Sequence, residues 1–104
     1  MKKVLHLNLY RKYFDQILKG EKTTEYREVT SYWSKRLEGR YYDVIKFRNG
    51  YRKDAPEMVV EFKGIGIVTF QTTPTYAIQL GKVLESKNVT WRKKAVRENE
   101  NTSC

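Results

Sequence analysis

Two hydrophobic periods follow one another in the first twenty residues, and they constrain what the start of this chain can fold into. Leucines at positions 5, 7 and 9 alternate with polar His6 and Asn8, which predicts a strand over residues 4–9 with one face in the core. Residues 12–19 then carry apolar side chains on one helical stripe: Tyr13, Phe14, Ile17 and Leu18. Gly20 is the expected helix end, in the left-handed conformation. The chain therefore opens with a strand and a helix.

The remaining pattern adds a second strand and helix, and then strands joined by turns. The expected elements are a strand at 22–28, a helix capped by Thr30 or Ser31 that runs through about Leu37, and strands at 42–48, 58–62, 65–70 and 76–84. Gly64 and Gly66 interrupt the middle strands and indicate a bulge or a barrel corner. This order predicts an α+β fold, a small mixed β-barrel of about five to six strands with two short helices at its ends.

A length of 104 residues suits one domain. The apolar pattern stops after Leu84, so we expect a domain over residues 1–86 and a mobile basic tail over residues 87–104. Cys104 and His6 are the only cysteine and histidine and cannot complete a four-ligand zinc shell, so we expect no metal and no cofactor. No apolar run approaches the roughly 20 residues of a membrane helix, and the start lacks the pattern of a signal peptide. We therefore expect a cytoplasmic monomer without membrane contact.

Basic charge and aromatic rings occur together in this composition. Lysine and arginine number 21 against 12 acidic residues, a formal net charge of +9, and aromatic residues make up 13% of the chain. Cations attract phosphates and flat rings stack on bases, so this composition favours single-stranded nucleic acid or a nucleotide as the partner. The alternative is a basic surface that contacts only solvent.

The junction between the first helix and the next strand carries a motif, Gly-x-Lys-x-x-Glu-x-Arg, at residues 20–27. It resembles the signature of the ASCH domains, relatives of the PUA RNA-binding domains, and the likeness covers about residues 4–86. The resemblance implies a PUA-like β-barrel whose cleft, between barrel and helices, binds RNA or a modified nucleoside. It also implies two enzymatic alternatives, because one ASCH branch hydrolyses the acyl amide of N4-acetylcytidine and another member is described as a ribonuclease.

The side chains of the motif suit such a cleft on chemical grounds. The Lys22 ammonium, just past the turn at Gly20, can reach a phosphate or an oxyanion. Glu25 can accept from a base edge or act as acid or base. Arg27, two residues on along the same strand face, can pair with Glu25 or bind a phosphate through its fork. The alternative is structural: a helix cap at Gly20 and a Glu25–Arg27 ion pair that stabilises the sheet.

Two positions depart from the Lys, Thr, Glu catalytic set of the hydrolase branch. Lys22 matches the lysine, but Glu25 stands at the position of the threonine. The connection that supplies the glutamate, residues 71–75 here, contains no acid, and Glu61 is the remaining carboxylate to consider. If the chain is an enzyme, Lys22 and Glu25 are therefore the expected catalytic pair.

Further residues are weaker candidates for the same ligand. Tyr26, Tyr32 and Trp33 can stack on a base, although aromatic residues on a short helix more often belong to the core. Lys46 and Arg48 share a strand face and can contact phosphates or remain solvated. The predicted ligand-binding set is Lys22, Glu25, Tyr26, Arg27, Lys46 and Arg48. We therefore expect binding of single-stranded RNA or a modified nucleoside, with a hydrolase or a protein-binding regulatory module as alternatives.

Overall fold

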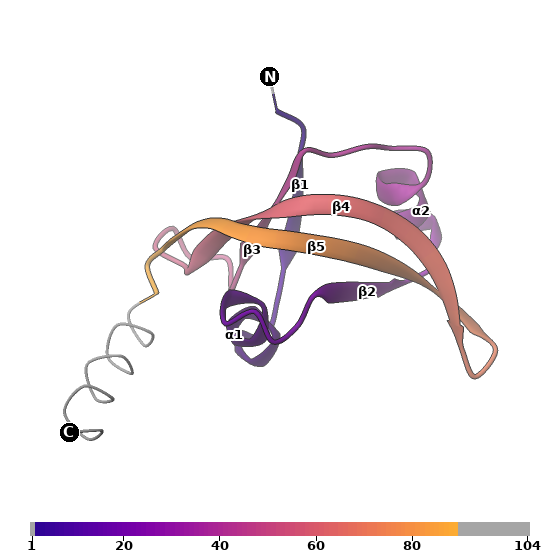
Figure 1. Cartoon of the computed structure of the whole chain (residues 1–104), viewed down its shortest axis with the longest axis horizontal. Helices are drawn as coiled ribbons and strands as arrows, with labels where there is room; N and C mark the ends of the chain where they lie inside the picture. The colour runs from indigo at the N-terminus through magenta and orange to yellow at the C-terminus, as the bar shows by residue number, and fades with distance from the viewer. Residues whose placement is uncertain (1, 90–104) are drawn as a thin grey trace.

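The computed structural model of the chain describes residues 2–89, which form five strands and two helices (Figure 1). In chain order these are β1 (Val4–Asn8), α1 (Arg11–Leu18), β2 (Thr24–Glu28), α2 (Ser31–Leu37), β3 (Val44–Arg48), β4 (Glu57–Phe70) and β5 (Thr73–Lys87). The strands form one sheet in the order β1-β3-β4-β5-β2. β1 and β3 are parallel, and the other neighbouring pairs are antiparallel. The predicted α+β class, with a mixed sheet and two short helices, is confirmed.

The predicted closure of the sheet into a barrel is wrong. β1 and β2 are the two ends of the strand order and do not pair with each other. The long strands β4 and β5 curve over the molecule (Figure 1). An arginine side chain spans the gap that remains: Arg27 Nη2 of β2 donates to the Asn8 carbonyl oxygen of β1 over 3.2 Å. A side chain, and not a ladder of backbone hydrogen bonds, therefore connects the two strands at this point.

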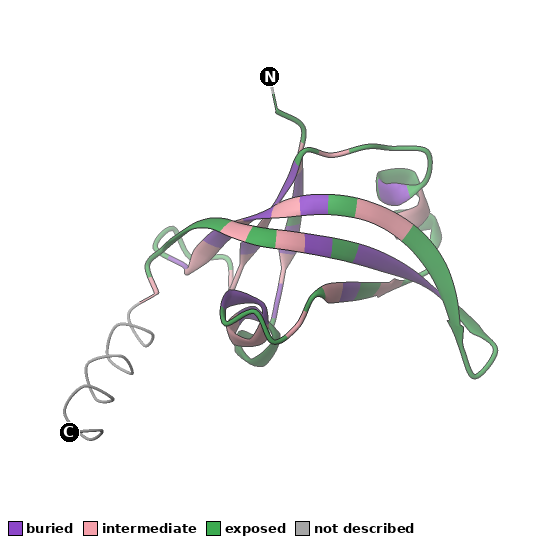
Figure 2. Ribbon diagram, in the orientation of Figure 1, coloured by how far each residue is buried: buried purple, intermediate pink, exposed green. Residues whose placement is uncertain are grey.

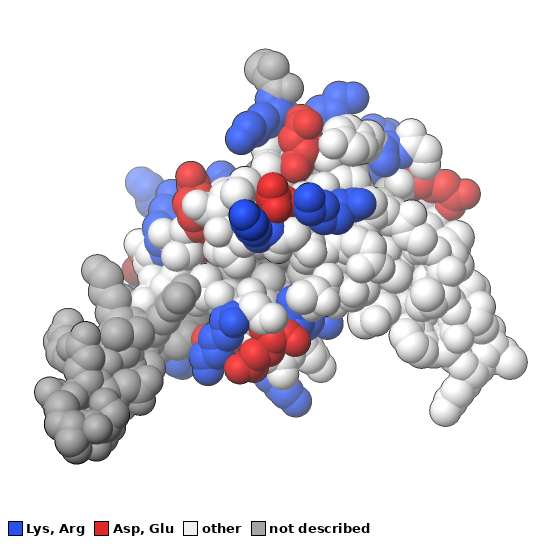
Figure 3. All heavy atoms as spheres, in the orientation of Figure 1, with Lys and Arg blue, Asp and Glu red and all other residues white. Residues whose placement is uncertain are grey.

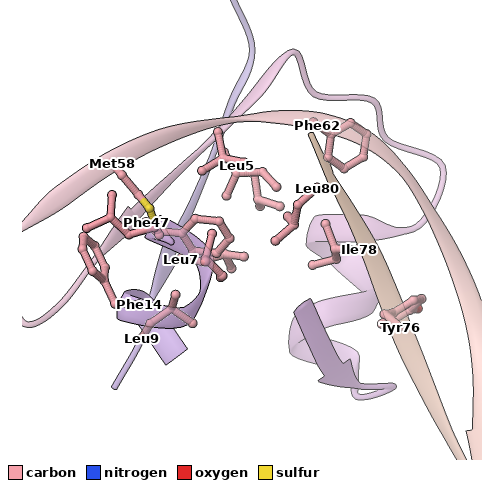
Figure 4. Packing of buried hydrophobic residues seen from close by; sticks show 14 of the residues in the cluster. Leu5, Leu7, Leu9, Phe14, Phe47, Met58, Phe62, Tyr76, Ile78 and Leu80 are labelled. Atoms are coloured by element: carbon pink, nitrogen blue, oxygen red, sulfur yellow. The ribbon is translucent and has the colours of Figure 1, made fainter. Parts of the chain in front are cut away.

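The core lies on the inner face of the curved sheet and is covered by α1 (Figures 2 and 4). Leu5 and Leu7 of β1 and Leu9 just after it are buried, as their alternation predicts. The stripe of α1 is also buried, except that Tyr13 remains 41% exposed. Leu37 of α2 and inward residues of the other strands complete the cluster: Ile45, Phe47, Met58, Val60, Phe62, Tyr76, Ile78 and Leu80. Thr30 caps α2, as expected, by accepting from the amide of Trp33 over 3.2 Å.

β4 and β5 form one hairpin that is longer than the sequence pattern predicts. The two halves expected at 58–62 and 65–70 are one strand with register shifts before Gly64, so the expected bulge is present. β5 begins at Thr73, inside the expected turn, which contracts to two residues at positive φ, Gln71 and Thr72.

The far end of this hairpin extends beyond its neighbouring strands. β3 pairs with β4 only at Glu57–Glu61, so among residues 2–89 no strand pairs with the outer edge of β4 at 63–70. Residues 64–81 contain no Lys, Arg, Asp or Glu, and the protruding end of the hairpin is uncharged in Figure 3. Ile67 and Phe70 are 58% and 51% exposed there.

The chain after β5 contacts the domain for two more residues. Asn88 Nδ2 donates to the Ala55 carbonyl over 3.2 Å, and Val89 packs against the core. The rest of the predicted tail, residues 90–104, lies outside the described residues. Neither helix in residues 2–89 has the length and apolar character needed to cross a membrane.

Candidate functional site

Two adjoining hollows lie in the gap between β1 and β2. The first hollow has a volume of about 780 Å³ and is lined by Asn8, Leu9, Tyr10, Tyr13, Lys22, Glu25, Tyr26, Arg27 and Tyr51. The second hollow has a volume of about 430 Å³ and is lined by His6, Leu7, Asn8, Arg27, Tyr32, Trp33, Arg48 and Tyr51. Asn8, Arg27 and Tyr51 line both hollows, so the two form one continuous cleft.

Lys22 reaches the first hollow because α1 ends just before it. Gly20 takes a positive φ of 81°, which glycine adopts without strain, and the chain turns off the helix axis there. Lys22 Nζ then lies 3.5 Å from Glu25 Oε1 and 5.5 and 5.2 Å from the ring centres of Tyr13 and Tyr26. A carboxylate and two aromatic rings therefore hold the ammonium in place, with 19% of the side chain exposed.

Glu25 is the buried acid of the cleft. It stands opposite Ile78 of β5 in the strand register, so it shares the inner face of the sheet with a core residue. Its side chain is only 5% exposed, and a carboxylate at this depth needs compensating charge. Arg27 Nη1 donates to Oε2, and Lys22 lies beside Oε1. Both carboxylate oxygens therefore face a cation.

Arg27 connects the two sides of the cleft. Besides its bond to Glu25, its guanidinium donates to the Tyr26 carbonyl over 2.9 Å and to the Asn8 carbonyl over 3.2 Å. It also lies 5.3 Å from the ring centre of Trp33. The expected pairing of Arg27 with Glu25 is present, and it comes with a contact to β1 that the spacing alone does not reveal.

Tyr51, which lines both hollows, follows a turn that is hydrogen-bonded to the end of β1. The side chain of Asn8 donates to the Gly50 carbonyl over 2.9 Å and accepts from the Gly50 amide over 3.1 Å. Asn49 Nδ2 donates to the Leu9 carbonyl over 2.9 Å. These bonds fix the turn against the end of β1, while Tyr51 itself is 88% exposed. The cleft thus has an exposed ring on a fixed backbone.

Sequence reasoning missed three aromatic residues of this cleft. Tyr10 is 81% exposed, at the start of α1, and Tyr13 and Tyr51 complete the set. Tyr13 belongs to the helical stripe that the sequence predicts as buried, and Tyr51 directly follows Asn49 and Gly50, a common turn pair. In the sequence, each of these three tyrosines lies near the end of a predicted strand or helix. That position does not by itself show that the three rings line the same cleft.

Of the two basic residues of β3, only Arg48 lines the cleft. Arg48 lines the second hollow, with Nε 3.0 Å from Glu57 Oε2. Lys46 lies outside both hollows, with Nζ 4.0 Å from Glu57 Oε1. Glu61 also lies outside them, and the amide of Lys82, which donates to it over 2.9 Å, lowers the pKa of its carboxyl. Of the predicted ligand-binding set, Lys46 alone is therefore absent from the cleft lining.

The three aromatic candidates all line the cleft, in different ways. Tyr26 is 42% exposed in the first hollow, with its ring 5.3 Å from that of Phe70 in an edge-to-face contact. Tyr32 and Trp33 bring α2 to the second hollow. Trp33 also packs against the core, so its side chain both stabilises the fold and lines the second hollow.

Comparisons of the chain with protein-family models, with curated proteins and with solved structures gave no match. In residues 2–89, no three His, Cys, Asp or Glu side chains are grouped so that they could hold a metal ion. What the cleft does offer is aromatic faces beside fixed cations, an arrangement that suits a flat ring with an attached anion.

Proposed function

We propose that this chain is an ASCH-like, PUA-related domain that binds single-stranded RNA or a modified nucleoside in the cleft between β1 and β2. The observation that carries the proposal is the convergence of the motif residues Lys22, Glu25 and Arg27 with exposed rings. Four tyrosines of the first hollow are more than 40% exposed: Tyr10, Tyr13, Tyr26 and Tyr51. Exposed rings on a fixed backbone can stack on bases, each stack contributing about 1–3 kcal/mol.

The charge of the cleft supports an anionic ligand. The cations that line the two hollows are Lys22, Arg27 and Arg48, and the carboxylates paired with them are Glu25 and Glu57. The cations of the cleft therefore outnumber the carboxylates that pair with them. The whole chain adds a net charge of +9, which attracts a polyanion from a distance.

The position of Glu25 favours binding over hydrolysis. A general acid or base must reach the proton that it transfers. Glu25 is buried, and its two oxygens face Arg27 and Lys22, so its interactions hold these cations in place. We therefore assign the motif to ligand binding, with Lys22 as the residue that contacts the ligand and Arg27 as the one that organises the cleft.

The direct test is binding of a short labelled single-stranded RNA, followed by fluorescence anisotropy between about 50 and 200 mM salt. The wild type should bind, and its affinity should fall as salt rises. Lys22→Ala should lose about tenfold or more in affinity, the equivalent of about 1.4 kcal/mol, and should melt close to the wild type because Arg27 still neutralises Glu25.

Lys63→Ala is the matched control, because Lys63 is 58% exposed on the outer part of β4 and does not line the cleft. Equal losses for Lys22→Ala and Lys63→Ala would mean that only net charge matters, and would contradict a specific cleft. Incubation with N4-acetylcytidine, followed by chromatography, tests the hydrolase alternative. Release of cytidine that Lys22→Ala abolishes would replace the binding proposal with an enzymatic one.

A further inference from the structure

The two hollows meet where Arg27 bonds to Asn8. This bond crosses from β2 to β1, and both residues line both hollows. Along the first strand, the second hollow takes His6 and Leu7, whereas the first hollow takes the residues after Asn8. The hollows are therefore successive along β1, and Arg27 lines both.

The two hollows differ in the chemistry that they offer. The first is lined by Tyr10, Tyr13 and Tyr26 together with the Lys22–Glu25 pair, so rings dominate its surface. The second is lined by Tyr32, Trp33 and Tyr51 together with Arg27 and Arg48, and it has no carboxylate among its lining residues. A base suits the first environment, and a phosphate followed by a second nucleoside suits the second.

Arg48 is held in a position to meet such a phosphate. Its Nε lies 3.0 Å from Glu57, and its Nη2 donates to the Arg52 carbonyl over 2.6 Å, so the side chain is fixed from two sides. The side chain is nevertheless 27% exposed, and it lines the second hollow. A fixed guanidinium loses little conformational entropy when it binds a phosphate.

We propose that the cleft is a two-nucleotide site. The first hollow takes one base among its tyrosines, the linking phosphate lies between Arg27 and Arg48, and the next nucleoside occupies the rest of the second hollow. Tyr51, which lines both hollows, is shared by the two nucleotides. This inference rests on the proposed RNA-binding function and specifies its ligand as a dinucleotide unit of a chain rather than a free nucleoside.

Calorimetric titration can separate these ligands. The four nucleosides are compared with the dinucleoside monophosphates ApA, CpC, GpG and UpU, and with a longer single-stranded RNA. For at least one base, the dinucleotide should bind about tenfold or more tightly than its nucleoside, a difference of about 1.4 kcal/mol.

Arg48→Gln should remove most of the dinucleotide's advantage in affinity over its nucleoside, because one of the two arginines that face the linking phosphate is lost. Lys46→Gln is a closely matched control, because Lys46 stands two residues away, pairs with the same Glu57 and lies outside both hollows. It removes the same charge and should leave both affinities at the wild-type level.

Three outcomes would overturn the two-nucleotide site while the RNA-binding function stands. These are equal affinity for nucleoside and dinucleotide, equal losses in Arg48→Gln and Lys46→Gln, and binding of long RNA without any binding of dinucleotides. If neither the longer RNA nor any smaller ligand binds, the proposed function fails together with the inference.

Discussion

Replacement of Arg27 by alanine tests the interaction on which the cleft depends. Arg27 donates to the buried Glu25 carboxylate, to the Tyr26 carbonyl and to the Asn8 carbonyl. Alanine removes all three bonds, leaves Glu25 with Lys22 as its remaining ionic partner, and detaches β2 from β1 at the cleft. We expect a loss of stability and of RNA binding together, in contrast to Lys22→Ala, which should lose binding alone.

The size of the effect follows from the contacts. A hydrogen bond to a charged group contributes about 1.5–3 kcal/mol, and an ordinary one about 0.5–1.5 kcal/mol. Simple addition would overestimate the loss, because Arg27 is 19% exposed and Lys22 stays beside Glu25. We therefore expect the free energy of unfolding to fall by about 2–3 kcal/mol, which lowers Tm by roughly 10–20 °C in a domain of this size.

Thermal and urea unfolding followed by circular dichroism measure this loss, and Arg52→Ala provides the control. Arg52 pairs with Asp54 in an ion pair whose side chains are 85% and 72% exposed, so its loss should cost little. Arg27→Lys should recover only part of the stability, because an ammonium cannot reproduce the planar fork that reaches Glu25 and Asn8 together. If Arg27→Ala and Arg52→Ala have the same Tm, or if Arg27→Lys restores both stability and binding, the role assigned to Arg27 is wrong.

Three further predictions concern Tyr51 of the cleft, Gly20 at the end of α1 and Tyr76 of the core. Tyr51→Ala should weaken RNA binding by about 1–3 kcal/mol in an anisotropy titration and leave Tm unchanged, because the ring is almost wholly exposed. Gly20→Ala should lower Tm through a strain of about 1 kcal/mol at positive φ, whereas wild-type stability in this variant would mean that the turn tolerates a side chain. The hydrogen bond to Glu38 raises the pKa of the Tyr76 phenol above 10.0, so the folded state holds this proton more tightly than the unfolded chain. Stability should therefore be complete below about pH 10 and fall as pH rises through the folded pKa, and Tyr76→Phe should flatten this fall in urea titrations at several pH values.

The local elements of the fold were predictable because their signals are local. The leucines of β1, the stripe of α1 and the cap at Thr30 each depend on residues a few positions apart. The strand partners were not predictable in this way. Glu25 stands opposite Ile78, and the side chain of Asn8 bonds to Gly50, and no pattern near either residue indicates these distant contacts.

In the candidate site, the contact between Glu25 and Arg27 was predictable, and the convergence of Tyr10, Tyr13 and Tyr51 was not. Glu25 and Arg27 share a strand face by simple alternation, so their contact follows from spacing. The contact of Lys22 with Glu25 does not follow from strand alternation, because β2 begins only at Thr24. It depends on the turn after α1, which places the Lys22 ammonium beside Glu25. The wrong prediction of a closed barrel also concerns distant residues. The pattern along each strand does not reveal whether β1 and β2, the two ends of the strand order, will pair or will be connected only by a side chain such as Arg27.

The uncharged end of the β4–β5 hairpin has a consequence for the colloidal behaviour of this protein. A net charge of +9 should keep the molecules apart in dilute buffer, but among residues 2–89 no strand pairs with the outer edge of β4 at 63–70, which carries the exposed Ile67 and Phe70. Salt shortens the screening length from about 30 Å at 0.01 M to about 3 Å at 1 M, and the repulsion then no longer holds these edges apart. Solubility should therefore fall as salt rises. Salt titrations of RNA binding consequently need a parallel light-scattering record, so that self-association is not counted as counterion release.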